Sequence, residues 1–122
     1  MQVRFDPSKP EYHFKNSNNR TFSLMQTLGV GNGPLRPITE IEDEDFDKVI
    51  RVNLGGVRNC LRAQLRVVKD GSSIVNIASA LGITAIPLLA AYTASKHAVV
   101  GLTKVAAREN ADKNIRINAV CP

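Results

Sequence analysis

From residue 43 to its end, the sequence alternates long segments of helical period with short β-branched runs. Over 43–69 the apolar residues recur at intervals of three and four, after an acidic start and before Gly71, so we expect a helix with one buried face. The run SIVNIAS at 73–79 is short, β-branched and preceded by a glycine turn. It predicts a strand buried on both faces, as in parallel sheets.

The same alternation is then repeated. Residues 90–112 have a helical pattern with small side chains that would let another backbone approach closely, and 114–122 form a second apolar strand. A series of helix, strand, helix and strand with connections of these lengths predicts parallel strands joined by right-handed crossovers. The predicted fold class is therefore α/β.

The part of the chain before this alternation is less informative. Residues 1–27 are polar and rich in Asn, with no sustained period, and we expect a divergent, poorly ordered N-terminal segment without chemistry. Three glycines and two prolines between Gly29 and Pro37 indicate a loop. With 122 residues in all, the chain has room for one modest domain, which we place at 28–122.

Composition excludes several classes of protein. The longest nearly apolar stretch, 83–92, is about half the ~20 residues that a membrane-spanning helix needs, and no apolar run follows the charges at the N-terminus as in a secretory signal. We therefore expect a cytoplasmic protein without a membrane partner. Cys60 and Cys121 are far from any CxxC spacing, so we expect no metal site and two reduced, buried cysteines, with a disulfide as the alternative.

The charge pattern raises the question of nucleic acid. The formal net charge is +5, and basic residues recur at helical spacing, which would suit a polyanion: Arg58, Arg62, Arg66 and Lys69. The aromatic residues, however, are scattered rather than interleaved with the basic ones as a base-stacking surface requires. Acidic residues open the same predicted helix, so its charge order complements the helix dipole. We predict a solvated face and no nucleic-acid partner.

Two polar residues stand out within the apolar patterns. Asn53 lies in the apolar stripe of the first predicted helix, where a buried amide needs hydrogen-bond partners. A bond to a neighbouring backbone and a role in a functional site are equal alternatives for it. Ser79 ends the strand at 73–79, on the edge of a parallel sheet where ligands bind, although serine also commonly ends strands.

Tyr92 and Lys96 are four residues apart on the second predicted helix, so both side chains project from one face. A phenol with an ordinary pKa of ~10 is a poor proton donor or acceptor at neutral pH, and a nearby ammonium favours the phenolate. The pair therefore suits acid/base chemistry in which the lysine activates the phenol and the tyrosine transfers the proton.

Together these residues resemble the active site of the short-chain dehydrogenase/reductase family. The matching text is FDKVIRVNLGGV, SIVNIASALG and AYTASKHAVVGLTKVAARENADKNIRINAVCP, and the resemblance covers about residues 28–122. In that family the site contains a helix Asn, a strand-ending Ser and a Tyr-x-x-x-Lys pair that begins 13 residues after the Ser, which is the separation of Ser79 and Tyr92. The resemblance implies a Rossmann-like, doubly wound parallel sheet.

The resemblance also implies a role for each residue in interconverting an alcohol and a ketone. Tyr92 would exchange a proton with the substrate oxygen as hydride passes to or from a nicotinamide, and Ser79 would hold and polarise that oxygen. Lys96 would lower the pKa of Tyr92 and bind the nicotinamide ribose, while Asn53 would position a water in a proton relay. The implied cofactor is NAD or NADP, contacted by Asn53, Tyr92 and Lys96. The segment is most similar to relatives that act on secondary metabolites.

The sequence departs from the family pattern at its N-terminal side. The TGxxxGxG turn that binds the cofactor diphosphate has no match in 1–27, and GVGNG at 29–33 is interpreted as a loop because prolines follow it. We also expect the strand that would neighbour 73–79 to be missing. The segment that would distinguish NAD from NADP is missing as well, so the preference cannot be predicted.

Relatives continue beyond the position of Pro122 with a nicotinamide contact and a substrate lid. We therefore expect a partial Rossmann-like domain, corresponding to the central and later portion of a longer protein. The alternative to catalysis is a truncated, non-catalytic remnant that acts as a dimerising module. The resemblance implies a homo-oligomer in either case, because the family's helices that match 43–69 and 90–112 pack against their copies in a second subunit.

Overall fold

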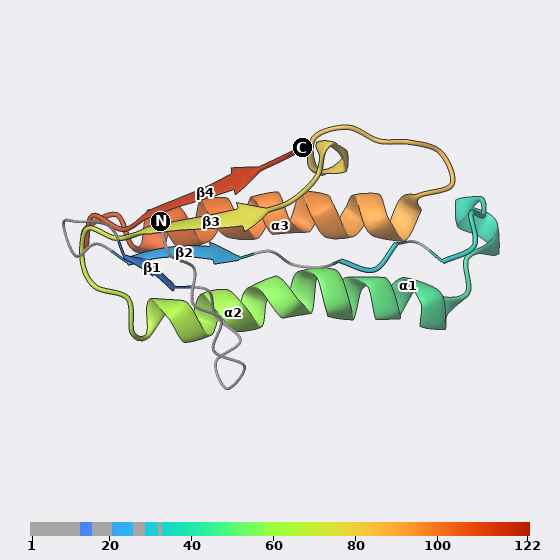
Figure 1. The fold of residues 1–122 in the computed structure, drawn as a ribbon. Coiled ribbons are helices and arrows are strands. Elements are labelled where there is room, and N and C mark those ends of the chain that lie inside the picture. The colour runs from blue at the N-terminus through green and yellow to red at the C-terminus, as the bar shows by residue number, and fades with distance from the viewer. Residues whose placement is uncertain (1–12, 16–20, 26–28, 32) are drawn as a thin grey trace.

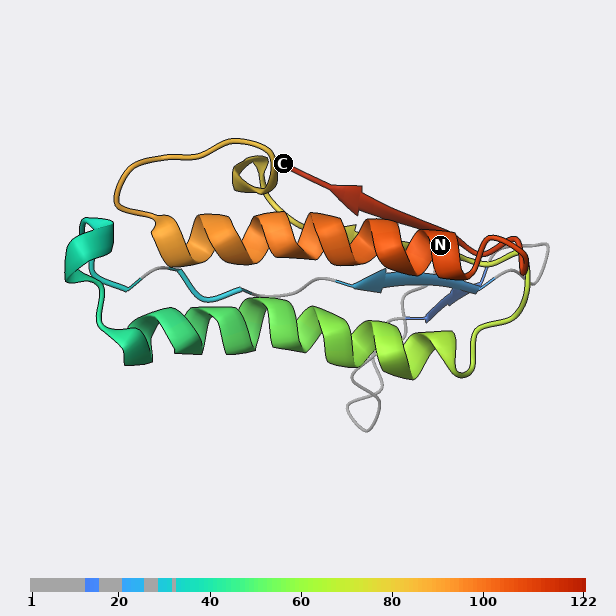
Figure 2. The same cartoon turned by 180° about the vertical axis from the view of Figure 1, so that it is seen from behind.

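A four-stranded sheet with helices against one face makes up the described part of the chain (Figures 1 and 2). The computed structural model describes residues 13–15, 21–25, 29–31 and 33–122. The elements in chain order are β1 (His13–Lys15), β2 (Thr21–Met25), the 3-10 turn η1 (Ile38–Glu40), α1 (Asp43–Ile50), the π-helical turn η2 (Arg51–Gly55), α2 (Gly56–Leu65), β3 (Ser73–Ile77), the 3-10 turn η3 (Ala80–Gly82), α3 (Ala90–Glu109) and β4 (Arg116–Val120).

The strands lie in the order β1-β2-β3-β4, and β2, β3 and β4 are parallel. Two crossovers connect them, first through α1 and α2 and then through α3, and both move in the same direction across the sheet. Because such crossovers are right-handed, the helices of both crossovers lie against the same face and form one layer. Figure 2 views this helical face, and Figure 1 views the opposite face. The predicted α/β class with a parallel sheet is confirmed.

The burial of β3 differs from the prediction. Ile74 and Asn76 are fully buried under the helices, whereas Val75 and Ile77 on the opposite face are only half-buried. The prediction of a strand buried on both faces is therefore wrong. The physical reason is that the described residues supply only one of the two helical layers of a doubly wound sheet.

The strand next to β3 is present in the structure. β2 pairs in parallel with β3, with Phe22 opposite Ser73 and Met25 opposite Asn76. The expectation that this strand is missing is therefore wrong, and 13–15 and 21–25 are strands within the segment predicted to be poorly ordered. The other positions of that segment, 1–12, 16–20 and 26–27, lie outside the described residues, so the prediction for them stays untested.

One uninterrupted helical stretch runs from α1 through η2 into α2 and ends at Leu65, four residues before the predicted end at 69. Just beyond this end, the backbone N–H groups of Val67 and Val68 both donate to the carbonyl of Gln64, which satisfies one of the last carbonyls of the helix. Gly71 then turns the chain with φ +79°, in the left-handed region that favours glycine. Helix α3 and strand β4 likewise lie within their predicted ranges and are shorter than predicted.

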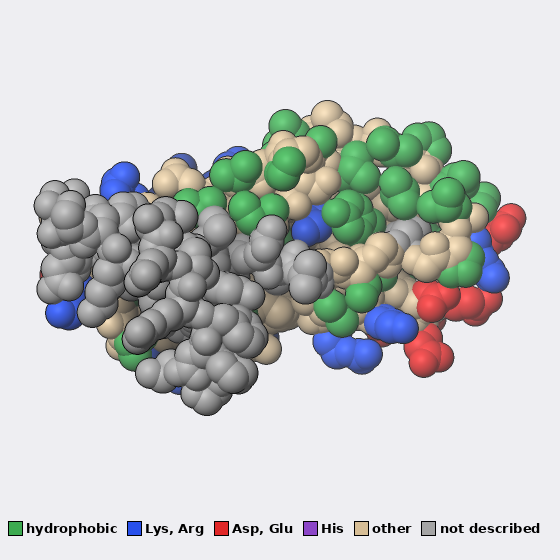
Figure 3. Space-filling view, viewed as in Figure 1, with side chains coloured by type: hydrophobic (Ala, Val, Ile, Leu, Met, Phe, Trp, Pro, Cys, Tyr) green, Lys and Arg blue, Asp and Glu red, His purple; other side chains and the backbone are tan. Residues whose placement is uncertain are grey.

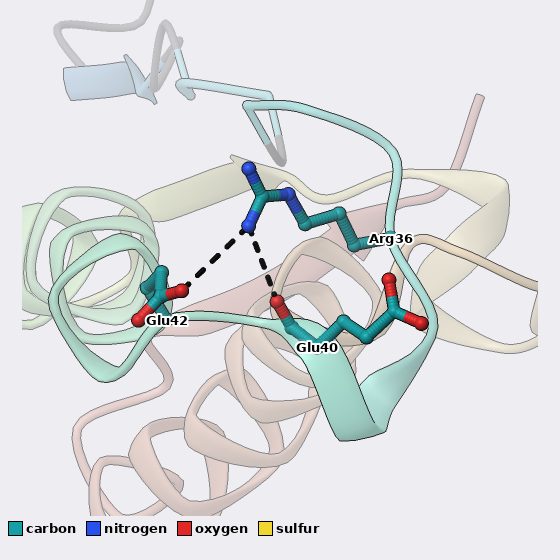
Figure 4. A network of polar contacts seen from close by, with 3 residues as sticks. All are labelled: Arg36, Glu40 and Glu42. Atoms are coloured by element: carbon teal, nitrogen blue, oxygen red, sulfur yellow. Dashed lines mark hydrogen bonds and ion pairs between the residues drawn. The ribbon is translucent and has the colours of Figure 1, made fainter.

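A small polar contact braces the loop that leads into α1 (Figure 4). Arg36 Nη1 donates to the carbonyl oxygen of Glu40 at 3.4 Å and lies 3.7 Å from Oε1 of Glu42. Since these side chains are largely exposed, the ion pair contributes only about 0.2–1 kcal/mol. Three acidic residues in the first turn of α1, Asp43, Glu44 and Asp45, complement the helix dipole.

The hydrophobic core lies between the sheet and the helices. Its central members are buried and come from the helices α2 and α3 and the strands β3 and β4: Val57, Leu61, Val99, Ala106, Ile74 and Ile117. Cys60 and Cys121 pack against this core, are half-buried rather than buried, and are not joined in a disulfide. Among the described residues, no helix has both the length and the apolar character that crossing a bilayer demands.

Candidate active site

The four residues singled out in the sequence come from three different elements. Asn53 lies in the π-helical turn η2, Ser79 directly precedes η3 beyond the carboxyl end of β3, and Tyr92 and Lys96 lie in the first turns of α3. Hydrogen bonds and close packing connect both η2 and η3 with the start of α3. The sheet thus brings the predicted residues toward one end of α3.

Tyr92 and Lys96 face one another along α3. The Lys96 Nζ atom lies 5.5 Å from the centroid of the Tyr92 ring, within the range of a cation–π contact. Lys96 is only 3% exposed, and this burial lowers its pKa from the ordinary 10.5 because desolvation disfavours the charged form. A lysine held this way places its amine beside the phenol at a fixed distance.

Asn53 is 1% exposed, and every polar atom of its amide has a partner. Its Oδ1 accepts from the backbone N–H of Val30 at 2.9 Å, and its Nδ2 donates to the Val30 carbonyl at 3.1 Å. The same Nδ2 donates to Ser95 Oγ at 3.1 Å. The backbone-bonded alternative therefore describes the side chain, and the role of Asn53 in holding a water stays a prediction.

Two residues that the sequence analysis did not single out complete this arrangement. Ser95 is fully buried, accepts from Asn53 and donates from its Oγ to the Tyr92 carbonyl at 2.7 Å. Gly29 lies so close to Asn53 that a Cβ atom there would be 3.0 Å from Oδ1. In the sequence, Ser95 could have been noticed as a small residue three positions after Tyr92, and Gly29 as the first glycine of the loop. Ser95 bonds to the turn of α3 that carries Tyr92, and Gly29 lets the loop backbone approach Asn53 closely.

Ser79 begins the short turn η3 and caps it. Its Oγ accepts from the backbone N–H of Leu81 at 3.3 Å, so its own hydrogen can still be donated to another oxygen. At the end of η3, Gly82 packs so closely on α3 that a Cβ atom would lie 3.1 Å from the Lys96 carbonyl oxygen. This close approach fixes the element that follows Ser79 against the helix that carries the Tyr92–Lys96 pair.

The loop between η3 and α3 adds an apolar surface to this end of the molecule. Three of its large hydrophobic residues are exposed: Ile83 (66%), Ile86 (53%) and Leu88 (41%). Hydrophobic side chains gather in the region of this loop, above the carboxyl ends of the strands (Figure 3). A ligand bound beside Ser79 and Tyr92 would therefore meet apolar as well as polar groups.

The groups present fit one part of a nicotinamide cofactor. A buried amine and a phenol at the carboxyl end of a parallel sheet offer hydrogen bonds of the kind that ribose hydroxyls take, which suits Tyr92 and Lys96 to the nicotinamide ribose. The loop at 29–31 contacts Asn53 through its backbone and precedes η1, a single 3-10 turn, instead of the long helix that binds a diphosphate. The described residues thus fit the ribose and not the diphosphate.

Comparison with known proteins agrees with this geometry. A family model described as enoyl-(acyl carrier protein) reductase matches residues 23–122. The short-chain dehydrogenase/reductase ABA4 of Pyricularia oryzae (strain 70-15) is 54% identical over 86 residues, which are 70% of this chain and 32% of that protein.

The solved structures that this chain resembles are also those of a reductase and a dehydrogenase. Levodione reductase matches with a TM-score of 0.72 and 38% identity, over 83% of this chain and 38% of its own. A 4-hydroxyisoleucine dehydrogenase solved with NADH and succinate matches with a TM-score of 0.64 and 40% identity, over 77% of this chain and 45% of its own. The chain spans about a third of the length of the curated relatives it matches.

The family match starts within β2 at residue 23, somewhat earlier than the predicted start at 28. It includes β3, β4 and all the helices, and the matched relatives are named dehydrogenases and reductases. The chain belongs to the short-chain dehydrogenase/reductase family.

Proposed function

We propose that this chain carries the acid/base residues of an NAD(P)-dependent oxidoreductase that interconverts an alcohol and a ketone. The observation that carries the proposal is the buried Lys96, whose Nζ lies 5.5 Å from the Tyr92 ring centroid. The phenol hydroxyl beside this amine is the group placed to pass a proton to and from a bound oxygen. A ketone oxygen takes this proton as it becomes an alcohol, and the reverse reaction returns it.

The other residues of the site act on the same oxygen or on Tyr92. Ser79 donates a hydrogen bond to the substrate oxygen and stabilises the charge that develops there. Asn53 and Ser95 hold the turn of α3 that carries Tyr92, through the bonds from Asn53 to Ser95 and from Ser95 to the Tyr92 carbonyl. In addition, Asn53 takes part in a proton relay with a water and Lys96.

The cofactor in this proposal is NAD or NADP, which supplies or accepts the hydride when bound. Tyr92 and Lys96 would hold its ribose, and Asn53, which bonds to Ser95 between them on α3, would contribute to the same site. The support is the donor chemistry of the pair and the NADH present in the 4-hydroxyisoleucine dehydrogenase structure. The proposal extends to a small alcohol or ketone substrate, a cytoplasmic location and a role in secondary metabolism.

The test measures NADH and NADPH binding by fluorescence and ketone reduction by the purified chain, with a thermal melt of the same sample to show that it is folded. We expect Tyr92→Phe to lower turnover by roughly 10²–10⁴-fold, as for the loss of a general acid or base. The exposed variant Arg58→Gln, which changes a side chain of α2 instead, should leave it unchanged. Turnover that survives Tyr92→Phe, or a folded chain that binds neither cofactor, would contradict the proposal.

A specific charge pattern favours a second candidate function, association of two copies along the α1–α2 face. Exposed acidic residues Asp43 and Asp47 precede exposed basic residues Arg62 and Arg66 on this stretch. An antiparallel pair centred near Gly55 would set each acidic end opposite a basic end. The centre allows close approach, because a Cβ atom added to Gly55 meets nothing within 4 Å. A homodimer of this kind is compatible with catalysis and with a non-catalytic dimerising module.

A further inference from the structure

Ser95 lies between the two proposed catalytic residues of α3 and is bonded to one of them. Its side chain is fully buried, and its Oγ donates to the carbonyl of Tyr92 at 2.7 Å. In an α-helix this carbonyl also accepts from the backbone N–H four residues later, which is that of Lys96. The Ser95 hydroxyl therefore acts on the carbonyl through which the backbones of Tyr92 and Lys96 are connected.

The same hydroxyl accepts a hydrogen bond from a different element. Asn53 Nδ2, in the π-helical turn η2, donates to Ser95 Oγ at 3.1 Å, across 42 positions of sequence. The Asn53 amide in turn accepts from the N–H of Val30 at 2.9 Å and donates to the Val30 carbonyl at 3.1 Å. A continuous path of hydrogen bonds therefore runs from the loop at Val30 to the carbonyl of Tyr92.

The donors along this path all point in one direction. The Val30 N–H donates to Asn53, and Asn53 donates to Ser95, which donates onward to α3. Hydrogen bonds in such a chain polarise and strengthen one another. Because the Ser95 hydroxyl has a single hydrogen, it cannot donate to Asn53 without releasing the Tyr92 carbonyl. The side chains of Asn53 and Ser95 are 1% and 0% exposed, so solvent does not replace either partner.

We propose that Ser95 is a positioning residue that couples the loop at Val30 to Tyr92, so that a shift of the loop moves the proposed acid/base group. By thermodynamic reciprocity, a change at Ser95 also alters the loop. A ligand that moves the Val30 backbone would therefore regulate Tyr92 without touching it. The catalytic meaning of this coupling rests on the proposed function, whereas the coupling itself does not.

The first test perturbs the loop and observes Tyr92. The chain has two tyrosines and no tryptophan, so in a Tyr12→Phe background the near-ultraviolet circular dichroism of tyrosine reports Tyr92 alone. The variant Gly29→Ala places a Cβ atom 3.0 Å from Asn53 Oδ1, whereas a Cβ atom at Gly31 meets nothing within 4 Å. We expect Gly29→Ala to change the Tyr92 signal and Gly31→Ala to leave it unchanged.

The second step removes the hydroxyl that completes the path. In a Ser95→Ala background, Gly29→Ala should no longer change the Tyr92 signal, because the path then ends before it reaches Tyr92. The matched control is Ser72→Ala, the same change at a buried serine directly before β3, and it should keep the full effect of Gly29→Ala. An effect of Gly29→Ala that is equal with and without the Ser95 hydroxyl would overturn the proposal. A Tyr92 signal that does not respond to the loop in folded protein would overturn it as well.

A measurement in the opposite direction does not need Gly29→Ala to fold. Ser95→Ala should speed hydrogen exchange at the Val30 amide relative to the amides of β3, and Ser72→Ala should not. Unchanged relative exchange at Val30 in folded Ser95→Ala protein would overturn the proposal. Neither measurement needs a cofactor or turnover, so their failure is distinguishable from ketone reduction that survives Tyr92→Phe, which contradicts the proposed function alone.

Discussion

The Asn53 side chain forms two hydrogen bonds with the backbone of Val30, 23 residues earlier in the chain. It accepts from the Val30 N–H at 2.9 Å and donates to the Val30 C=O at 3.1 Å. A side-chain amide can form this pair of bonds with one residue only when its position and the loop backbone are both fixed. The π-helical turn η2 supplies the first condition, and the close approach of Gly29 supplies the second. The side-chain amide of Asn53 therefore connects the loop at Val30 with Ser95 in the candidate active site.

Replacing Asn53 with Leu should destabilise the chain strongly. The substitution leaves the part-buried N–H and C=O groups of Val30 without their partner, which costs about 1–3 kcal/mol for each unsatisfied group. Chemical denaturation would measure the change in the free energy of unfolding. The exposed neighbour Arg51→Leu is the control, and a loss for Asn53→Leu no larger than for that control would contradict the argument.

The variant Gly29→Ala should be destabilised, whereas Gly31→Ala should not be. A Cβ atom at Gly29 would lie 3.0 Å from Asn53 Oδ1, while at Gly31 it would meet nothing within 4 Å. We expect a loss of about 1–3 kcal/mol at the first position, typical of overpacking, and a change within about 0.5 kcal/mol at the second. Thermal melts of the two variants, compared side by side, would test this, and equal melting temperatures would show that the contact is not restrictive.

The variant Lys96→Met should be more stable than the parent at neutral pH while losing turnover. In the folded chain burial lowers the Lys96 pKa below 10.5, so the unfolded chain binds the proton more tightly. The stability of the parent should therefore rise with pH between the lowered folded pKa and 10.5, and the variant should lack this rise. Removing this desolvation cost should raise the melting temperature of the variant above that of the parent.

Melting curves of both proteins across this alkaline range measure the effect. Lys96→Arg keeps a positive charge at all accessible pH values and serves as the control, because it should also lack the rise but gain no stability. A parent whose stability falls over the same range would show that the lysine pKa is raised rather than lowered.

Thr103→Val should cost about 1–3 kcal/mol of stability, although it changes no volume in the core. Thr103 Oγ1 accepts from Asn76 Nδ2 at 2.9 Å and donates to the Val99 carbonyl at 2.7 Å, and both side chains are buried. Without the hydroxyl, Asn76 Nδ2 loses its hydrogen-bond acceptor within the core. Denaturant titration would measure this loss, and Thr103→Ser should recover most of it because the hydroxyl returns.

Charge reversal should test the antiparallel pairing of the α1–α2 face. Asp47→Arg and Arg62→Asp, each made alone, should weaken self-association, and the double variant should restore it because the opposite charges again face one another. Sedimentation velocity at low and at high salt measures the effect. Single variants that associate as strongly as the parent, or a parent that stays monomeric at every concentration, would contradict the pairing.

The fold could be predicted where periodicity is strong and local. The helical stripe beginning at residue 43, the strand at 73 and the helix at 90 all appear in the structure, with ends that differ by a few residues. β2 was missed because TFSLM follows polar sequence and owes its strand form to pairing with β3, which is not a local property. The half-buried state of Val75 was missed for the same reason, since it depends on which helices cover the second face.

The candidate site divides in a similar way. Tyr92, Lys96 and Ser79 could be chosen from spacing, because a helical turn and a strand end are local features. Ser95 and Gly29 could not, because their importance comes from contacts with Asn53 across 42 and 24 positions of sequence. Long-range contacts of this kind become visible only when the backbone is folded.

The order of the strands also has a kinetic consequence. β2, β3 and β4 follow one another in the sequence and lie side by side in the sheet in the same order. Each strand therefore needs only the crossover helix beside it to reach its neighbour, and the parallel part of the sheet can grow one unit at a time from either end. We expect this stepwise growth to keep contact order low for a parallel sheet, which favours rapid folding and lets the first unit form while the last is still being synthesised.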